Sequence, residues 1–175
     1  MSALRGVAAF LLVALALVLQ VSVFSELAWN GIVPDLVLLV VVAGALARGG
    51  QFGLVLGFAA GVLLDLTPPA DHSAGRWALS LLLVGYVAGL VRPAARPGER
   101  SPSALSVVAV VAGCSFIGTS VFALSGVLLG EQAGGFGSML EVVGISLLWD
   151  VLLTPLVLPW VMALFRRLEP ERVRA

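Results

Sequence analysis

Three glycines and an aspartate recur at intervals of four between residues 53 and 65, and every residue between them is apolar. On a helix this spacing places Gly53, Gly57, Gly61 and Asp65 along one slowly spiralling stripe. A stripe of glycines lets a second helix approach closely, which is how helices associate in lipid. A carboxylate at its end needs a partner or water, because charge is costly in hydrocarbon. The pattern predicts a packing seam inside a membrane protein, with a buried helix of a soluble protein as the alternative.

The composition is typical of a membrane protein. The 175 residues are 60% hydrophobic and 11% charged, whereas soluble domains carry roughly 25% charged residues. The net charge is zero, so bulk electrostatics give no indication of nucleic-acid binding. Arg5 precedes an apolar stretch that is longer than the core of a signal peptide, which predicts an uncleaved first span.

Six apolar segments predict an all-α membrane protein, a single integral membrane domain of residues 1–175. Three of the segments are short for a bilayer. Arg48 nevertheless favours full spans over a re-entrant hairpin, because the hairpin would leave this charge at mid-membrane. The predicted spans are residues 4–24, 32–47, 52–66, 77–91, 104–129 and 140–165.

The arginines predict the orientation. All ten basic residues are arginine, and with both termini in the cytoplasm nine of the ten lie on the cytoplasmic side. Arg76 is then the one arginine outside. The predicted cytoplasmic residues are Arg5, Arg48, Arg92, Arg96, Arg100, Arg166, Arg167, Arg172 and Arg174.

Residues for catalysis are scarce. The chain has one histidine, His72, in a predicted outer loop and one cysteine, Cys114, inside the fifth apolar segment. Neither nucleotide-binding glycine motifs nor metal-ligand spacings occur. We therefore expect a protein that is not an enzyme and that holds no cofactor and no metal.

The polar residues inside the predicted spans are the candidate site. Asp35, Asp65, Asp150 and Arg76 all fall toward the outer side in this topology, and we predict that Arg76 pairs with Asp65 or Asp35. For Asp35 an alternative stays open, because an acid that follows Pro34 is also typical of the start of a helix.

Two further patterns concern packing. Gly85 and Gly89 form a second face of small residues, so we expect the third and fourth helices to pack closely, and we consider all five glycines a seam for helix packing or partner binding. In the sixth segment, Pro155 and Pro159 each free a carbonyl four residues earlier, which indicates either a structural kink or the lining of a polar pocket.

Four stretches, in order along the chain, carry a family resemblance. They are Pro34-Asp35-Leu36 at the start of the second segment, Gly57-Phe58 through Gly61 to Asp65, Gly75 followed by Ala78-Leu79 and Gly85-Tyr86, and Asp150 through Pro155 to Pro159. Together they resemble the MreD family of rod shape-determining membrane proteins. The match covers nearly the whole chain, although the proline-rich loop of residues 67–74 departs from it.

The resemblance implies a non-enzymatic component of the bacterial cell-elongation complex, the elongasome, in the cytoplasmic membrane. Such a protein binds MreC and works near MreB, RodA and its transpeptidase partner, where it helps to direct peptidoglycan synthesis and to maintain cell shape. The resemblance also implies a fold similar to the substrate-binding subunits of energy-coupling-factor transporters. A small-molecule-binding subunit of such a transporter is the alternative function.

Overall fold

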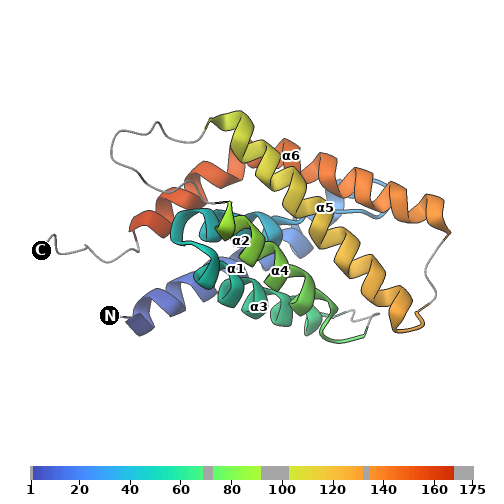
Figure 1. The fold of residues 1–175 in the computed structure, drawn as a ribbon, viewed down its shortest axis with the longest axis horizontal. Coiled ribbons are helices and arrows are strands. Elements are labelled where there is room, and N and C mark those ends of the chain that lie inside the picture. The colour runs from blue at the N-terminus through green and yellow to red at the C-terminus, as the bar shows by residue number, and fades with distance from the viewer. Residues whose placement is uncertain (1, 69–72, 92–102, 132–134, 168–175) are drawn as a thin grey trace, which may run out of the picture.

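The chain forms an all-helical bundle in a computed structural model that describes residues 2–68, 73–91, 103–131 and 135–167 (Figure 1). His72 and the arginines at 92, 96, 100, 172 and 174 lie outside the described residues. The elements found in the described part are α1 (Ser2–Ser22), the 3-10 helix η1 (Phe24–Leu27), α2 (Leu36–Arg48), α3 (Gly50–Asp65), α4 (Arg76–Leu90), α5 (Ala104–Leu128) and α6 (Phe136–Arg167).

Each of the six α-helices coincides with one of the six apolar segments of the sequence. The largest differences lie at two helix starts. Helix α2 begins at Leu36 and not at residue 32, because Asp35 caps it by accepting a hydrogen bond from the Leu38 N–H. Helix α6 begins at Phe136 and not at residue 140.

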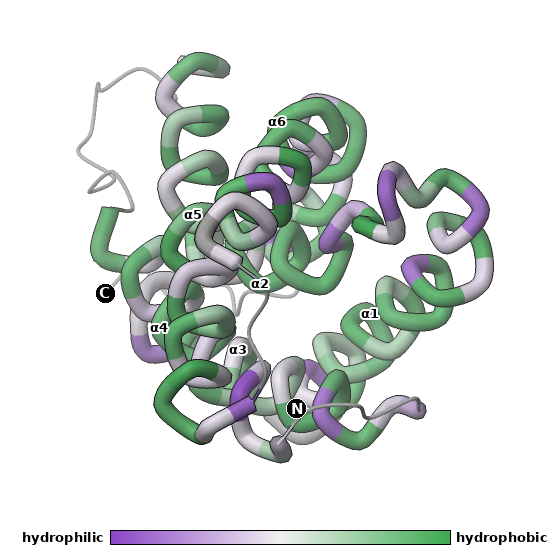
Figure 2. Tube along the Cα trace, turned by 90° about the vertical axis from the view of Figure 1, so that its right-hand side faces the viewer, coloured by the Kyte–Doolittle hydropathy of each residue, from purple (hydrophilic) through white to green (hydrophobic). Residues whose placement is uncertain are grey.

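Three helices, α1, α5 and α6, are long and apolar enough to cross a membrane, whereas α2, α3 and α4 are shorter apolar helices. Hydrophobic residues predominate along all six (Figure 2). Many large apolar side chains are exposed on the outside of the bundle, among them Val55, Leu124, Leu156 and Trp160. A surface of this kind fits hydrocarbon better than water.

The short helix α2 is the centre of the bundle. Every residue from Leu36 to Ala47 is buried, and α2 contacts each of the other five α-helices. A helix that is apolar on all sides must be enclosed on all sides. Helix α3 follows after the single residue Gly49, whose φ of +96° is a conformation that favours glycine.

Helices α3 and α4 meet backbone to backbone along the five glycines, which we call the glycine seam. A Cβ added at Gly53, Gly57 or Gly61 would collide with the backbone of α4 near Gly85, Leu81 and Trp77 respectively. Added at Gly85 or Gly89, it would collide with α3 at Gly53 or Gly50. The close packing expected of these two helices is therefore present. Since each helix covers the glycines of the other, the seam does not offer a free surface to a second protein.

Two arginines of the bundle, Arg48 and Arg166, lie near each other. Arg48 at the end of α2 lies over the Phe52 ring, 4.0 Å from its centroid, and Phe52 makes an edge contact with Phe165, next to Arg166. The start of α1 lies at this same end as the last turns of α6 (Figure 1). The arginines at 48 and 166 thus lie at one end, as the predicted orientation requires.

The glycine seam gives a first prediction. Gly57→Ala places a methyl group against the Leu81 carbonyl and should destabilise the protein by about 1–3 kcal/mol, as overpacking does. Gly113→Ala in α5 is the matched control, because an added Cβ there meets nothing within 4 Å. Alanine should keep or raise stability at that position. Thermal unfolding in mild detergent measures both, and equal melting temperatures for the two variants would contradict the packing.

Candidate functional site

Asp150 is the most deeply buried carboxylate of the bundle, with 1% of its surface exposed. Its Oδ1 accepts a hydrogen bond from the Asp35 backbone N–H at 3.0 Å, and its Oδ2 accepts one from the Ser115 hydroxyl at 2.6 Å. Asp150 therefore ties the start of α2 and the middle of α5 to α6. Bonds to a carboxylate are the stronger kind, and in an apolar interior they hold the three helices in one arrangement.

The start of α2 is satisfied by two further side chains. Asp35 Oδ1 accepts from the Leu38 N–H at 2.9 Å, and Gln20 Oε1, reaching from α1, accepts from the Val37 N–H at 3.1 Å. The first N–H groups of a helix have no partner within the helix and need such acceptors where water is absent. Helix-start chemistry was the alternative left open for Asp35, and it is the role the structure gives this residue.

Asp65 performs the same task for α4. Its carboxylate accepts from the N–H groups of Gly75 at 2.9 Å, Trp77 at 3.1 Å and Ala78 at 3.1 Å. The last residue of α3 thus caps the first turn of α4, where the helix dipole favours negative charge.

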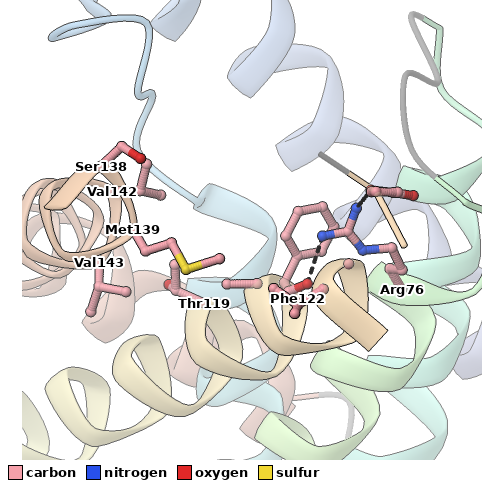
Figure 3. A pocket seen from close by; sticks show the side chains of 11 residues that line it. Arg76, Thr119, Phe122, Ser138, Met139, Val142 and Val143 are labelled. Carbon is pink, nitrogen blue, oxygen red and sulfur yellow. Dashed lines mark hydrogen bonds and ion pairs between the residues drawn. The ribbon is translucent and has the colours of Figure 1, made fainter. Parts of the chain in front are cut away.

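Arg76 points away from this cap toward α5. It forms an ion pair with Glu131, donates Nη2–H to the Phe122 carbonyl at 2.6 Å and donates Nε–H to the Ser125 hydroxyl at 3.3 Å. Its guanidinium lies over the Phe122 ring at 3.9 Å (Figure 3). Gly126 makes room for it, since a Cβ there would collide with the guanidinium. The predicted pairing of Arg76 with Asp65 or Asp35 is wrong, because both aspartates accept from helix N–H groups while Glu131 reaches Arg76 from beyond the end of α5.

Glu131 is itself fixed in place. The Ser73 N–H donates to its Oε1 at 2.6 Å. That backbone hydrogen bond, together with the nearby Arg76 charge, holds the pKa of Glu131 below its usual 4.5. Glu131 therefore stays ionised and connects the residues before α4 to the end of α5.

A cleft opens beside this ion pair, where the end of α5 and the start of α6 diverge (Figure 1). Its volume is about 300 Å³. Arg76 and Phe122 lie at one side, and Met139 and Val143 of α6 face them from the other (Figure 3). Because the polar groups at its edge already bond to one another, the cleft presents mainly apolar side chains.

The remaining residues of the predicted site lie on the surface or at turns. Phe58 on α3 and Tyr86 on α4 are exposed and point away from the bundle, as does Pro155 on α6. Pro34 is buried before the α2 cap, and Gly75 precedes α4 with a φ of +97°. The predicted polar residues thus divide into two groups, one around Asp150 and one around Asp65 and Arg76.

Sequence reasoning missed Gln20 and Ser115, which complete the group around Asp150. Each is one of several scattered polar residues in a long, mainly apolar segment, which is only a weak signal that it has a buried partner. Ser80, outside these two groups, was missed as well, and its hydroxyl donates to the Gly118 carbonyl at 2.6 Å between α4 and α5. No group of three or more histidine, cysteine, aspartate or glutamate side chains that could hold a metal is present in the described part of the chain.

The fold and the polar groups define a membrane protein built as a helical bundle, in which buried carboxylates cap helices and join them. Comparison with family models identifies the protein more narrowly. Residues 1–168 match the model for the rod shape-determining protein MreD, so the chain belongs to the MreD family, whose members are shape-determining membrane proteins. No curated protein and no solved structure matches the chain. The fold similarity to energy-coupling-factor subunits stays a prediction.

The Asp150 group gives a second prediction. Asp150→Ala leaves the Asp35 N–H and the Ser115 hydroxyl buried without their acceptor, at about 1–3 kcal/mol for each group. Asp150→Asn retains one oxygen acceptor, so its stability should lie between that of the wild type and that of Asp150→Ala. The concentration of denaturing detergent that unfolds each variant gives the order of their stabilities. Glu141→Ala, which removes an exposed bond to Asn30, is the control and should change little. An Asp150→Ala variant as stable as this control would show that the hydrogen bonds are not structural.

The pH dependence of Glu131 gives a third prediction. A carboxyl whose pKa is lowered in the folded state adds stability above its unfolded pKa of about 4.5, and this stability is lost as the pH falls through the folded value. Wild type should therefore exceed Glu131→Gln in unfolding midpoint by a constant margin from pH 7 to about pH 5. The margin should vanish as the solution becomes more acidic than pH 4.5. A margin independent of pH would contradict the ion pair.

Proposed function

We propose that the chain is a non-enzymatic membrane scaffold of the cell-elongation complex. In this role it binds a MreC-like membrane protein and helps to direct peptidoglycan synthesis along the wall of a rod-shaped cell. RodA, its transpeptidase partner and MreB are the further members of the complex with which it would work. Membership of the MreD family carries this proposal.

The distribution of polar groups supports a scaffold. Asp35, Asp65, Asp150 and Arg76 all bond within the bundle and hold helix starts in place. The outward helix faces are apolar, with large exposed side chains on α3, α5 and α6. Such a molecule offers its neighbours rigid helix surfaces, which is how helices of separate proteins associate in a bilayer.

The scaffold would span the cytoplasmic membrane six times, with both termini in the cytoplasm. The arginines at the Arg48 and Arg166 end of the bundle support this orientation. The opposite end, with the Asp65 cap and the Arg76–Glu131 pair, would then face outward. Helices α2 to α4 are shorter than the bilayer core, and the polar groups at their ends would lie where the membrane thins locally.

Affinity capture from native membranes tests the function and is the fourth prediction. The tagged chain, purified in mild detergent, should retain its MreC-like protein, while an equally tagged, unrelated membrane protein should not. Depletion of the chain should turn rods into rounded cells, and restoring it should return rod shape. Capture of a pair of ATPases with a coupling membrane protein, or rods that keep their shape on depletion, would contradict the scaffold role.

A further inference from the structure

One face of α6 is both exposed and interrupted by proline. Helix α6 packs against α2 and α5 with its other side. On the outer side Leu152, Leu156 and Trp160 follow at intervals of four and are 61%, 64% and 78% exposed. Pro155 and Pro159 are exposed on the same side. We call these five residues the α6 proline face.

The prolines leave two backbone carbonyls without their usual donors. A helix carbonyl accepts from the N–H four residues later, and proline has no N–H. The carbonyls of Val151 and Pro155 therefore lose this bond to Pro155 and Pro159. A helix carbonyl lies between its own residue and the residue four positions later. The Val151 carbonyl therefore lies between half-buried Val151 and exposed Pro155, and the Pro155 carbonyl lies between two exposed residues, Pro155 and Pro159.

Both carbonyls fall within the hydrocarbon if α6 spans the membrane as proposed. Pro155 lies eleven positions before Arg166 (166 − 155), or about 16 Å along the helix at 1.5 Å per residue. Glu141, on the other side, lies fourteen positions away (155 − 141), or about 21 Å. The bilayer core is about 30 Å thick, so neither charged end brings headgroup water to these carbonyls. A bare carbonyl at this depth is costly, and lipid tails offer no donor.

We propose that the α6 proline face binds a single transmembrane helix of the partner protein, and that this helix donates hydroxyl or amide hydrogen bonds to the Val151 and Pro155 carbonyls. The inference rests on the proposed function, which supplies the MreC-like protein as the source of the helix. The leucines and Trp160 would pack against it on either side of the two polar contacts.

A second copy of this chain fits the face less well. Within the face itself, the indole N–H of Trp160 is the one side-chain donor. Several hydroxyls of the other described helices, those of Ser80, Ser115 and Thr119, already donate within their own bundle. The outward faces of α3 and α5 contain no proline, so their helices need no outside donors.

Cross-linking locates the partner helix. A photo-reactive amino acid is placed at Leu156 or, as the control, at Val55 on α3, both of which are 64% exposed. Each variant is co-expressed with the MreC-like protein of the same cell, and the membranes are irradiated. We expect an adduct to that protein several-fold stronger from Leu156 than from Val55. Equal adducts, adducts only from Val55, or adducts only to a second copy would overturn the proposal.

Substitution tests the hydrogen bonds. The double variant Pro155→Ala, Pro159→Ala supplies both missing N–H groups from α6 itself, so the partner's donors lose their acceptors. Capture of the MreC-like protein should weaken roughly tenfold, as expected when two hydrogen bonds are lost, while the melting temperature of the chain alone stays the same or rises. Capture equal to wild type would overturn the role of the carbonyls.

Two leucine-to-alanine substitutions test the docking face without changing the backbone of α6. Leu152→Ala and Leu124→Ala remove side chains that are both 61% exposed, one on the α6 proline face and one on α5. Leu152→Ala alone should weaken capture, and equal effects of the two would contradict the docking face. If wild type captures no MreC-like protein at all, the proposed function fails. If capture succeeds but cross-links arise elsewhere, only this inference fails.

Discussion

The structure depends on one constraint, which is that hydrocarbon cannot hydrogen-bond to a polar group. The three described aspartates meet this constraint as hydrogen-bond acceptors: Asp65 and Asp150 accept from donors outside their own helices, and Asp35 caps the helix that it precedes. Asp35 and Asp150 satisfy donors at the start of α2, and Asp65 satisfies those at the start of α4. Asp65 and Asp150 therefore join helices, because removing either carboxylate exposes donors on a different helix. This linkage fixes where α2 and α4 begin relative to α3 and α6.

The short helices follow from the same constraint. Helix α2 has 13 residues, or about 20 Å at 1.5 Å per residue, against a bilayer core of about 30 Å. A helix this short would expose its ends to lipid if it stood alone. Enclosure by the other five helices and capping by Gln20 and Asp35 remove that penalty. The glycine seam contributes by bringing α3 and α4 together closely enough to cover one side of α2.

Much of this architecture could be predicted from local sequence, and the limits are physical. Apolar runs predicted the six helices, the four-residue glycine spacing predicted the contact of α3 with α4, and Pro34-Asp35 indicated a helix start. The partner of Arg76 could not be found in this way. Glu131 follows α5 in the sequence, and its distance from Arg76 depends on how α4 and α5 pack, which periodicity does not encode. Gln20 and Ser115 were missed for the same reason, since a polar residue scattered in an apolar run does not identify its distant partner.

The polar side chains of the bundle bond to one another or to its backbone, so few of them can take part in binding a neighbouring protein in the membrane. Asp35, Asp65, Asp150 and Arg76 already bond within the bundle, so its outward faces must act mainly through shape and through the backbone. A regular helix presents no free backbone acceptor to lipid, because each carbonyl in its interior bonds to the next turn. Helix α6 is the described helix with prolines inside it, and it exposes them on the side away from α2 and α5. An interrupted helix at the edge of the bundle thus combines an apolar surface with directional acceptors, which gives a neighbouring helix both affinity and a fixed register.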